Sequence, residues 1–413
     1  MATDRTTELK VLRPEEWDGW WDNLIRAFGA GQTSSEEREL DKSLTEFDRS
    51  LATWDGDELV GTAGAFSFRM TVPGGSLVPA AGVTMVSVAA THRRRGVLTS
   101  MMRRQLDDVR ALGEPLAVLT ASEPAIYGRF GYGAATFQLH AEIDTSRVQP
   151  ALPAGTEEIR LRYAQPADVL AECEAVYAAL VPRRPGMLAR RPGWERVALL
   201  DPESERDGAS ALQCVVAERD GEVTGYARFR TKLGWGPTGH NGTVSLEDLA
   251  ALDPATDAAL WRFLFDIDLM TNLTVRGRPV DDAWQYLVSD IRRCVPRLRD
   301  SCYVRLVDVG AALAARTYQT PVDVVFEVAD DFCPWNAGRW RLTGDTKGAS
   351  CERTTDAADL TLSVRELGAA YLGGVSLLSL AAAGRVRELR DGALTEASVA
   401  FASPVVPWLP HGF

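Results

Sequence analysis

Alternating apolar and polar positions predict a β-hairpin near the start of the chain. Residues 51–70 hold two apolar runs joined by Asp55-Gly56, a pair that suits a tight turn with positive φ. Residues 214–230 repeat this plan around Asp220-Gly221. A strand and then a helix are expected after each hairpin, at 83–89 and from 96 in the first case and at 244–251 and 258–270 in the second. We therefore expect two related α/β units, with chance similarity of two hairpins as the alternative.

A third region begins near Cys294 and has a less regular pattern. Strands are expected at 303–309, 322–328, 340–342 and 359–364, and helices at 311–318, 365–373 and 377–383. This order is typical of an α+β domain. The stretch 149–155 holds two prolines and a glycine and is the best linker candidate. We therefore expect three domains, at residues 1–148, 149–293 and 294–413, with a poorly marked second boundary.

The composition is that of a multidomain globular protein with an acidic surface. The chain has 413 residues, 25% of them charged, and a formal net charge of −12. This balance disfavours nucleic acid, because nucleic-acid binders need a dense cationic surface, and it favours cationic partners. The charged first ten residues do not resemble a signal peptide, and the longest apolar run, 375–383, contains two serines. We expect a cytoplasmic protein without a membrane span.

Cysteines and histidines do not form a recognisable metal motif. The six cysteines include no Cys-x-x-Cys pair, and they are expected to be small buried residues in a reducing compartment. The four histidines lie far apart in the sequence. We therefore expect no bound metal.

The candidate chemistry lies where the strand at 83–89 leads into a helix. Thr91-His92-Arg93-Arg94-Arg95-Gly96 joins them, and the helix begins at Val97 with an apolar face made of Leu98, Met102, Leu106, Val109 and Leu112. From His92 to Gln105 there are five arginines and no acidic residue. A helix start beside arginines and a glycine is an anion site, because unpaired N–H groups and guanidinium groups bind phosphate oxygens. The alternative is a solvated basic helix start.

The next strand, 115–120, is apolar on both faces, and it is followed by Ala121-Ser122-Glu123 and by Ile126-Tyr127-Gly128-Arg129-Phe130-Gly131-Tyr132-Gly133. An Arg-x-x-Gly turn and helix, then a strand, then a tyrosine in a short helix resemble the coenzyme A site of the GNAT superfamily. Together with Thr91–Gly96, these residues closely resemble the Eis (enhanced intracellular survival) N-acetyltransferases of bacteria.

The resemblance covers nearly the whole chain. It implies tandem GNAT-like mixed α/β domains, the second degenerate, followed by an α+β domain similar to sterol carrier proteins. Cys333-Pro334-Trp335-Asn336-x-Gly338-Arg339 resembles the family motif of that last domain. Leu98 stands where the wider superfamily has a small residue, and Eis proteins also carry a large one there. The resemblance further implies a homohexamer.

The resemblance assigns residues to acetyl-CoA, which serves as co-substrate. The expected cofactor-binding residues are Val86, Ser87 and Val88 along the pantetheine arm, Arg94, Arg95, Gly96, Val97, Leu98 and Thr99 around the pyrophosphate, and Ser122 and Glu123 on the far side of the arm. Tyr127 is the expected general acid for the leaving thiolate, with Tyr132 as its rival. A core tyrosine is the alternative for either residue.

A base is also needed, because an alkylamine with a pKa near 10.4 is less than about 0.1% neutral at pH 7. The resemblance points to the terminal carboxylate of Phe413. Residues 404–413 are apolar and hold three prolines, which suits a fixed tail. His411 is the rival base, and a tail that only packs on the core is the alternative.

The second α/β unit provides an internal control. When Val88-Ala89-Ala90 is placed over Leu249-Ala250-Ala251, Arg93-Arg94-Arg95-Gly96 falls on Pro254-Ala255-Thr256-Asp257. The cations and the glycine are absent there. We therefore expect that the second unit does not bind coenzyme A.

Two function classes follow. The first is an acetyl-CoA-dependent N-acetyltransferase acting on a cationic amine, such as an aminoglycoside, a polyamine, a basic peptide or a protein lysine. The second is a non-catalytic coenzyme A- or lipid-binding regulatory protein that keeps the GNAT fold. Residues 17–22 hold three tryptophans and two aspartates that could receive a cation, although a helix that packs its tryptophans is the favoured interpretation.

Overall fold

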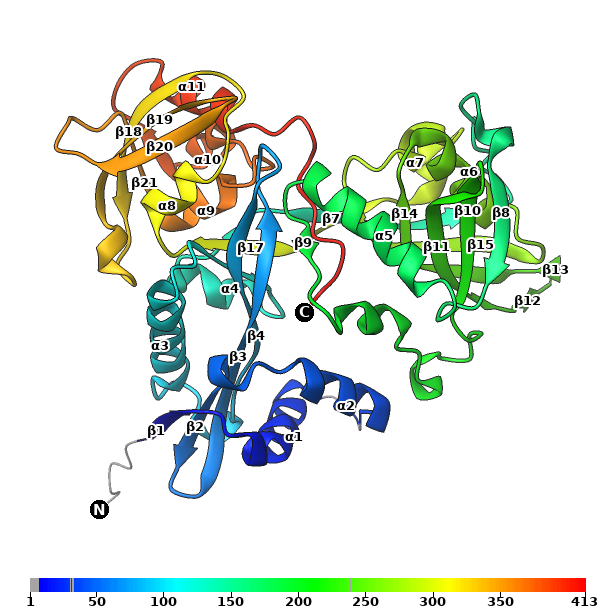
Figure 1. Cartoon of the computed structure of the whole chain (residues 1–413), viewed down its shortest axis with the longest axis horizontal. Coiled ribbons are helices and arrows are strands. Elements are labelled where there is room, and N and C mark those ends of the chain that lie inside the picture. The colour runs from blue at the N-terminus through cyan, green and yellow to red at the C-terminus, as the bar shows by residue number, and fades with distance from the viewer. Residues whose placement is uncertain (1–6, 30, 32, 238) are drawn as a thin grey trace. The chain divides into compact units, whose positions relative to one another are not determined.

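The computed structural model describes residues 7–413 except 30, 32 and 238, and it divides the chain into two compact units. Unit 1 contains the described residues up to Thr136, Ser301–Pro407 and Gly412–Phe413. Unit 2 contains Phe137–Asp300 and Trp408–His411. Both units combine β-sheets with helices (Figure 1).

The first part of unit 1 is a sheet with the strand order β1-β2-β3-β4-β5-β17-β6. Only β4 and β5 are parallel neighbours in this order. The strands are β1 (Glu8–Val11), β2 (Leu51–Asp55), β3 (Glu58–Thr71), β4 (Leu77–Val88), β5 (Leu116–Thr120), β17 (Cys302–Leu306) and β6 (Gly133–Ala134). The helices of this part are α1 (Trp17–Phe28), α2 (Ser35–Leu44), α3 (Val97–Ala111) and α4 (Pro124–Tyr127).

The predicted first hairpin is present as β2 and β3. Asp55 pairs with Glu58, so the turn is Gly56-Asp57, one residue later than expected, and Gly56 has a φ of 62°. β5 is buried along most of its length between β4 and β17, as its apolar sequence predicts.

The predicted helix at 97–112 is present as α3, and it covers the centre of the sheet. Met102, Leu106 and Val109 are buried in a core shared with residues of β4 and β5. Leu112 was expected on this buried face, but it is 63% exposed. The reason is that α3 ends at Ala111 and the chain turns away at Gly113, whose φ is 74°.

The α1 helix packs its tryptophans, as the favoured interpretation holds. Trp17, Trp20 and Trp21 are buried, and the indole of Trp20 donates to the carbonyl of Leu51 at 2.9 Å. The carboxylates of α1 bind Arg38 and Lys42 of α2. The same two cations lie over the Trp17 ring, at 5.5 and 5.1 Å from its centre, so the chain's own side chains occupy this aromatic and acidic cluster.

The two related sheets exchange strands. β17, which follows the whole of unit 2 in the chain, pairs with β5 and β6 in unit 1. β7 (Phe137–Asp144), which follows β6, pairs with β15 and β16 in unit 2. The expected linker 149–155 lies within unit 2, where the Ala151 N–H donates to Leu287. The ranges 1–148, 149–293 and 294–413 remain a proposal about the order of domains along the chain.

The last part of unit 1 is a second sheet with the order β20-β19-β18-β21-β22. Its strands are β18 (Val322–Ala329), β19 (Gly338–Asp345), β20 (Gly348–Arg353), β21 (Leu360–Ser363) and β22 (Val386–Glu388). Its helices are α8 (Val309–Ala314), α9 (Val364–Ala370), α10 (Leu377–Ala382) and α11 (Ala393–Phe401). The α+β character expected for this region is confirmed, whereas β20, β22 and α11 are not predicted from the sequence.

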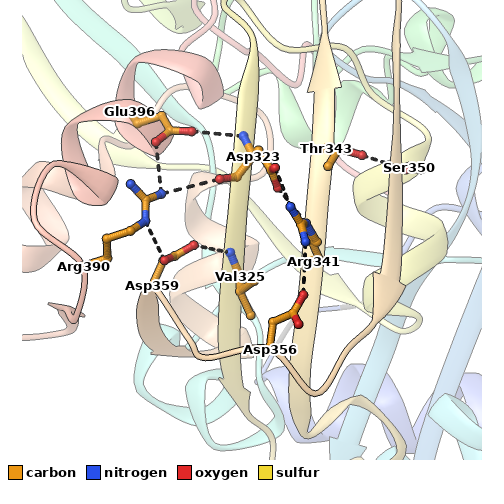
Figure 2. Close-up of polar contacts among 9 residues, drawn as sticks. All are labelled: Asp323, Val325, Arg341, Thr343, Ser350, Asp356, Asp359, Arg390 and Glu396. Atoms are coloured by element: carbon orange, nitrogen blue, oxygen red, sulfur yellow. Dashed lines mark hydrogen bonds and ion pairs between the residues drawn. The ribbon is translucent and has the colours of Figure 1, made fainter.

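Exposed charged residues pair with one another across this second sheet (Figure 2). Arg341 of β19 lies 2.7 Å from Asp323 and 3.1 Å from Asp356. Arg390 lies 2.6 Å from Asp359, whose other oxygen accepts the backbone N–H of β18. Exposed pairs of this kind contribute little to stability, because water screens them and their long side chains lose entropy.

A buried pair in unit 1 is expected to matter far more. Arg305 of β17 is fully buried, and its Nη2 lies 2.6 Å from Oδ2 of Asp330, which also accepts from Asn336 at 3.1 Å. Arg305→Leu leaves that carboxylate buried without its cation, so we expect the free energy of unfolding of unit 1 to fall by about 3–5 kcal/mol. Urea unfolding followed by tryptophan fluorescence measures the loss. Arg341→Leu is the control and should leave the unfolding midpoint unchanged; equal losses in both variants would contradict the expectation.

Unit 2 has one main sheet with the order β16-β7-β15-β14-β11-β10-β8. Its strands are β7, β8 (Arg160–Ala164), β10 (Gln213–Arg219), β11 (Glu222–Lys232), β14 (Gly242–Ala251), β15 (Met270–Pro279) and β16 (Arg297–Asp300). Unit 2 also contains three short strands outside this sheet, β9 (Leu188–Ala189), β12 (Trp235–Gly236) and β13 (Gly239–His240), and the helices α5 (Leu170–Leu180), α6 (Pro254–Phe265) and α7 (Trp284–Leu287). The predicted second hairpin is confirmed, with positive φ at both Asp220 and Gly221.

All six cysteines are buried and free of disulfide bonds. Among the described residues, no helix is both long enough and apolar enough to cross a membrane.

Candidate functional site

The β4 strand separates from its parallel neighbour partway along its length. β4 and β5 pair only from Ala80–Gly82 to Leu116–Val118 in the described chain, although β4 continues to Val88. The rest of β4 thus presents a backbone edge that β5 does not cover. An extended ligand can add to such an edge as a further strand.

A β-bulge lies in this separated part of β4. The register between β3 and β4 shifts between Thr62 and Gly64, and Met85 has a φ of 53°, which is uncommon for a residue with a side chain. The Thr62 hydroxyl donates to the Met85 carbonyl at 2.7 Å and lies 2.7 Å from the Ser87 hydroxyl. The Thr62 side chain of β3 therefore stabilises the bulge through these hydrogen bonds. The sequence does not predict it, because 83–89 fits a regular strand equally well.

The turn after β4 presents open donors at the start of α3. Arg94 and Gly96 have φ values of 65° and 83°, and left-handed residues in a turn bring successive N–H groups onto one side. A Cβ added at Gly96 would meet nothing within 4 Å, so the approach to this backbone is open. The first turn of α3 contains no acidic residue. These features are typical of a phosphate-binding helix start.

The separated strand and this turn border one cavity of about 500 Å³. It is lined by eleven of the site residues expected from the sequence: Val86, Ser87, Val88, Arg94, Gly96, Val97, Leu98, Thr99, Ser122, Glu123 and Tyr127. Six further lining residues are not expected from the sequence: Ala27, Phe28, His92, Arg93, Ile126 and Arg129. Arg95 and Phe413 are not among the lining residues.

Tyr127 ends α4 and lines this cavity. Burial, and then the charge of Glu123, raises the pKa of its hydroxyl above the ordinary value of 10.0, so it is protonated at neutral pH. Its rival Tyr132 packs edge-on at 6.1 Å between ring centres and is fully buried. The Tyr132 hydroxyl has no hydrogen-bond partner among the described residues and does not line the cavity. Of the two tyrosines, Tyr127 is therefore the one whose side chain can reach a ligand in this cavity.

Phe413 is held against β4. Its main-chain oxygen accepts a hydrogen bond from the Thr84 hydroxyl at 3.0 Å, and its ring packs edge-on against Phe68 with centroids 5.2 Å apart. Thr84 is two residues before Val86, which lines the cavity. Thr84 is not among the site residues expected from the sequence, although a hydroxyl in a mostly apolar strand is a signal that could have identified it.

His411, the rival base, belongs to unit 2. Its Nε2 lies 3.2 Å from the Tyr177 hydroxyl, and its ring stacks on Trp194 at 6.3 Å between ring centres. These contacts place the imidazole in a packed aromatic setting within unit 2.

The corresponding helix start in unit 2 is closed by its own carboxylate. α6 begins at Pro254, after a two-residue connection from β14, and Asp253 accepts the N–H groups of Ala255 and Thr256 at 3.0 and 3.1 Å. Arg219 lies 3.1 Å from the same carboxylate. The donors that a phosphate would need are therefore already used.

β14 and β15 of unit 2 also separate, but the side chain of Arg278 occupies the strand edge that this separation leaves. β14 and β15 pair only as far as Leu246 and Val275, but the guanidinium of Arg278 donates to the carbonyl of Leu249 at 2.5 Å. Leu249 is the counterpart of Val88 in the sequence overlay. Arg278 is further held by Asp282 at 2.5 Å. Both features support the expectation that unit 2 does not bind coenzyme A.

Arg94 and Arg95 of the turn differ in their position relative to the cavity. Arg94 lines the cavity and Arg95 does not, so Arg94→Gln should weaken coenzyme A binding about tenfold and Arg95→Gln by less. Isothermal titration calorimetry measures both dissociation constants, and higher salt should narrow the difference between Arg94→Gln and the parent. Arg104→Gln is the control, because Arg104 pairs with Asp108 on the exposed side of α3. Equal weakening in all three variants would contradict the placement.

Comparisons with known proteins agree with this architecture. Family models described as acetyltransferase (GNAT) domains match residues 8–135 and 186–306, and a sterol carrier protein domain model matches 309–410. An uncharacterised N-acetyltransferase of Streptomyces coelicolor is 76% identical over 412 residues, covering 99% of this chain and all of the relative. The N-acetyltransferase Eis of Mycobacterium tuberculosis is 33% identical, covering 97% of this chain and 98% of Eis.

A solved structure supports the same assignment. The crystal structure of Eis1 from Mycobacterium abscessus matches with a TM-score of 0.83 and 34% identity, covering 99% of this chain and all of Eis1. The fold expected from the sequence, two GNAT domains followed by a sterol-carrier-like domain, is thereby confirmed. Identity above 30% over nearly the full length, together with the GNAT models, shows that this chain is an acyltransferase and belongs to the Eis family of GNAT N-acetyltransferases.

Proposed function

We propose that the protein transfers the acetyl group of acetyl-CoA to an amine of a cationic acceptor. The observation that carries the proposal is the cavity of unit 1, where a separated strand, an open anion-binding turn and a protonated tyrosine lie together. GNAT acetyltransferases use acetyl-CoA, and the open approach at Gly96 and the free edge of β4 suit its pyrophosphate and its extended pantetheine arm.

When bound, acetyl-CoA supplies the thioester whose acetyl group is transferred. Arg94 and the N–H groups of Gly96, Val97, Leu98 and Thr99 would hold the pyrophosphate, and Arg95 would add charge from outside the cavity lining. The backbone of Val86, Ser87 and Val88 would pair with the arm, with Ser122 and Glu123 on its other side. These groups fix the position of the thioester relative to the acceptor.

The carboxylate of Phe413 is the proposed general base. A cationic amine must lose a proton before it attacks, and a carboxylate fixed beside β4 can accept that proton at one of its oxygens. Support comes from the hydrogen bond that Thr84 donates to Phe413 and from the packing of its ring on Phe68. The alternative base, His411, is engaged with Tyr177 and Trp194.

The hydroxyl of Tyr127 is the proposed general acid. It would donate its proton to the sulfur that leaves the acetyl group, because a departing thiolate is stabilised by a nearby O–H donor. Its position supports this role, because Tyr127 lines the cavity and its hydroxyl is protonated at neutral pH.

The proposed acceptors are polycations. The chain carries a net charge of −12, which favours the approach of amine-rich molecules by long-range attraction. Aminoglycosides, polyamines, basic peptides and protein lysines all have this chemistry, and the choice among them stays open.

A thiol-release assay with acetyl-CoA and a panel of such amines tests the proposal. We expect release of coenzyme A that depends on a polycationic amine, and acetylated product in the mass spectrum. Thermal stabilisation by coenzyme A without product for any amine would overturn the transferase proposal while leaving cofactor binding intact.

We also propose the homohexamer that the resemblance implies and a cytoplasmic location. The six buried free thiols suit a reducing compartment. Light scattering coupled to gel filtration tests the hexamer, and a monomer mass at micromolar concentration would overturn it.

A further inference from the structure

One exposed face of the unit 2 sheet gathers cationic side chains from three adjacent strands. In the register of β7 and β16, His140 lies directly opposite Arg297, and Gln138 lies opposite Arg299. On the other side of β7, Glu142 lies opposite Thr274 of β15. Because side chains two residues apart share a face, His140, Arg297 and Arg299 point to the same side of the sheet.

The other face of these strands is apolar. Leu139, Ala141 and Ile143 of β7 are buried in the main core of unit 2 with Leu273 and Val275 of β15. The alternation therefore fixes the cationic residues on the outer face, and a slip of one residue in register would bury them. The strand register therefore places these cationic residues side by side.

The cationic face is hollowed into a cavity of about 470 Å³. Its charged lining residues are Arg276, Arg297, Arg299, His140 and Glu142. None of these residues lines the cavity of unit 1. Arg276 enters the cavity beside an irregularity in β15, where the pairing with β7 is interrupted between Val275 and Arg278.

The charges in this cavity are not balanced. Glu142 lies 3.2 Å from Arg297 and is the single carboxylate in the lining. The guanidinium groups of Arg276 and Arg299 have no ion-pair or hydrogen-bond partner among the described residues. Neighbouring like charges destabilise a sheet, and in a chain with 57 acidic residues the shortage of carboxylates here is unusual.

His140 lies within the same excess of positive charge. Its Nε2 is buried and has no hydrogen-bond partner among the described residues. Burial, followed by the charges of Arg299 and Arg276, lowers the pKa of its imidazole below 6.5. The other charged groups facing it are Arg297 of β16 and Glu142 of its own strand, while Arg292 and Arg293, which precede β16, are not in the lining.

We propose that this cavity of unit 2 is a second anion site, which binds a multiply charged phosphate or pyrophosphate group. Arg276 and Arg299 supply the free guanidinium donors, because forked N–H groups match the oxygens of phosphate. The buried Nε2 of His140 provides a further donor once the ring is protonated or takes the matching tautomer. The group is either free in solution or the headgroup of an anionic lipid.

Phosphate binding is expected to depend on pH, because His140 lines the same cavity as Arg276 and Arg299. A bound phosphate opposes the charges of Arg276 and Arg299, so it raises the pKa of the imidazole and binding takes up a proton. Binding should therefore tighten as the pH falls from 8 to 6. Phosphate also protonates over this range, which weakens binding, so the imidazole resonance itself is the decisive measurement.

The test uses the full chain saturated with coenzyme A, so that the anion site of unit 1 does not compete. Only four histidines are present, so the His140 C2 proton can be assigned from a His140→Gln spectrum. Sodium pyrophosphate should shift this resonance to saturation and raise the pH at which it titrates. Arg276→Gln with Arg299→Gln should weaken pyrophosphate binding about ten- to hundredfold.

Two controls distinguish the proposal from general charge effects and separate the two sources. Arg160→Gln removes an exposed arginine of β8 in the same sheet and should leave the shift unchanged. Sedimentation with phosphatidylglycerol vesicles, compared with phosphatidylcholine vesicles, tests the headgroup. Saturable binding of pyrophosphate supports a free ligand, and binding to anionic vesicles alone supports the lipid source. No shift and no vesicle binding, or equal effects in Arg160→Gln and the double variant, would overturn the proposal.

Discussion

Tyr127→Phe is expected to lower kcat about 100- to 10,000-fold with polyamine or aminoglycoside acceptors. The substitution removes one oxygen and leaves the ring that packs against Tyr132. The leaving sulfur then loses its only proposed proton donor, whereas the groups proposed to hold the pyrophosphate and the arm are untouched. Coenzyme A affinity should therefore stay within about twofold, and stopped-flow thiol release together with calorimetry separates the two quantities.

Tyr132→Phe is the matched control. Its hydroxyl is fully buried without a hydrogen-bond partner in the described structure, so removing the oxygen should leave turnover intact and leave the unfolding midpoint equal or higher. A large loss in Tyr132→Phe, with full activity in Tyr127→Phe, would exchange the two roles. Full activity in both variants would discard a tyrosine as the acid.

The local part of the site could be predicted from the sequence because each element has a short-range signal. The apolar strand 83–89, the arginine-rich turn and the amphipathic helix after Gly96 are contiguous, so the strand-turn-helix order already places donors at one helix start. In unit 2 the sequence at 254–257 lacks the arginines and the glycine, which predicts the loss of the anion site. The structure adds the carboxylate of Asp253, which accepts the N–H groups of that helix start.

Long-range pairings could not be predicted in this way. The exchange of β7 and β17 between the two sheets depends on strand partners that lie more than a hundred residues apart in the sequence. The sequence of a strand indicates whether its faces are buried, but it does not indicate which strand pairs with it. The Arg278 side chain that fills the separated strands of unit 2 gives no periodic signal. The cationic face of unit 2 likewise appears only when β7, β15 and β16 are placed side by side.

Phe413 shows the same limit at the chain's end. Its proline-rich tail predicts a fixed terminus, but the contact with Thr84 joins residues 329 positions apart in the sequence. From the sequence, the family resemblance points to the terminal carboxylate, and His411, two residues away, is its rival. In the structure the Phe413 oxygen accepts from Thr84 of β4, and the His411 ring contacts Tyr177 and Trp194; these contacts are why we propose the carboxylate as the base.

Replacing the terminal carboxylate of Phe413 by a carboxamide is expected to lower kcat/KM about 100-fold or more at pH 7. The amide keeps the shape of the terminus, the hydrogen bond from Thr84 and the ring contact with Phe68, but it cannot accept a proton from an ammonium group. The variant is made by intein ligation, and thiol release is measured from pH 6 to 10. The loss should shrink at high pH, where the acceptor amine is already neutral and needs no base.

Two further variants test whether the loss comes from the carboxylate of Phe413 or from the imidazole of His411. A two-residue extension after Phe413 moves the carboxylate away from β4 and should reduce turnover at least as much as the amide, while coenzyme A affinity is kept. His411→Gln should leave the pH dependence of the parent unchanged, since its imidazole is held by Tyr177 and Trp194. Full activity of the amide, with the loss appearing in His411→Gln instead, would transfer the role of base to the imidazole. Full activity in all three would mean that the acceptor reaches the thioester already deprotonated, and that the tail only packs on the core.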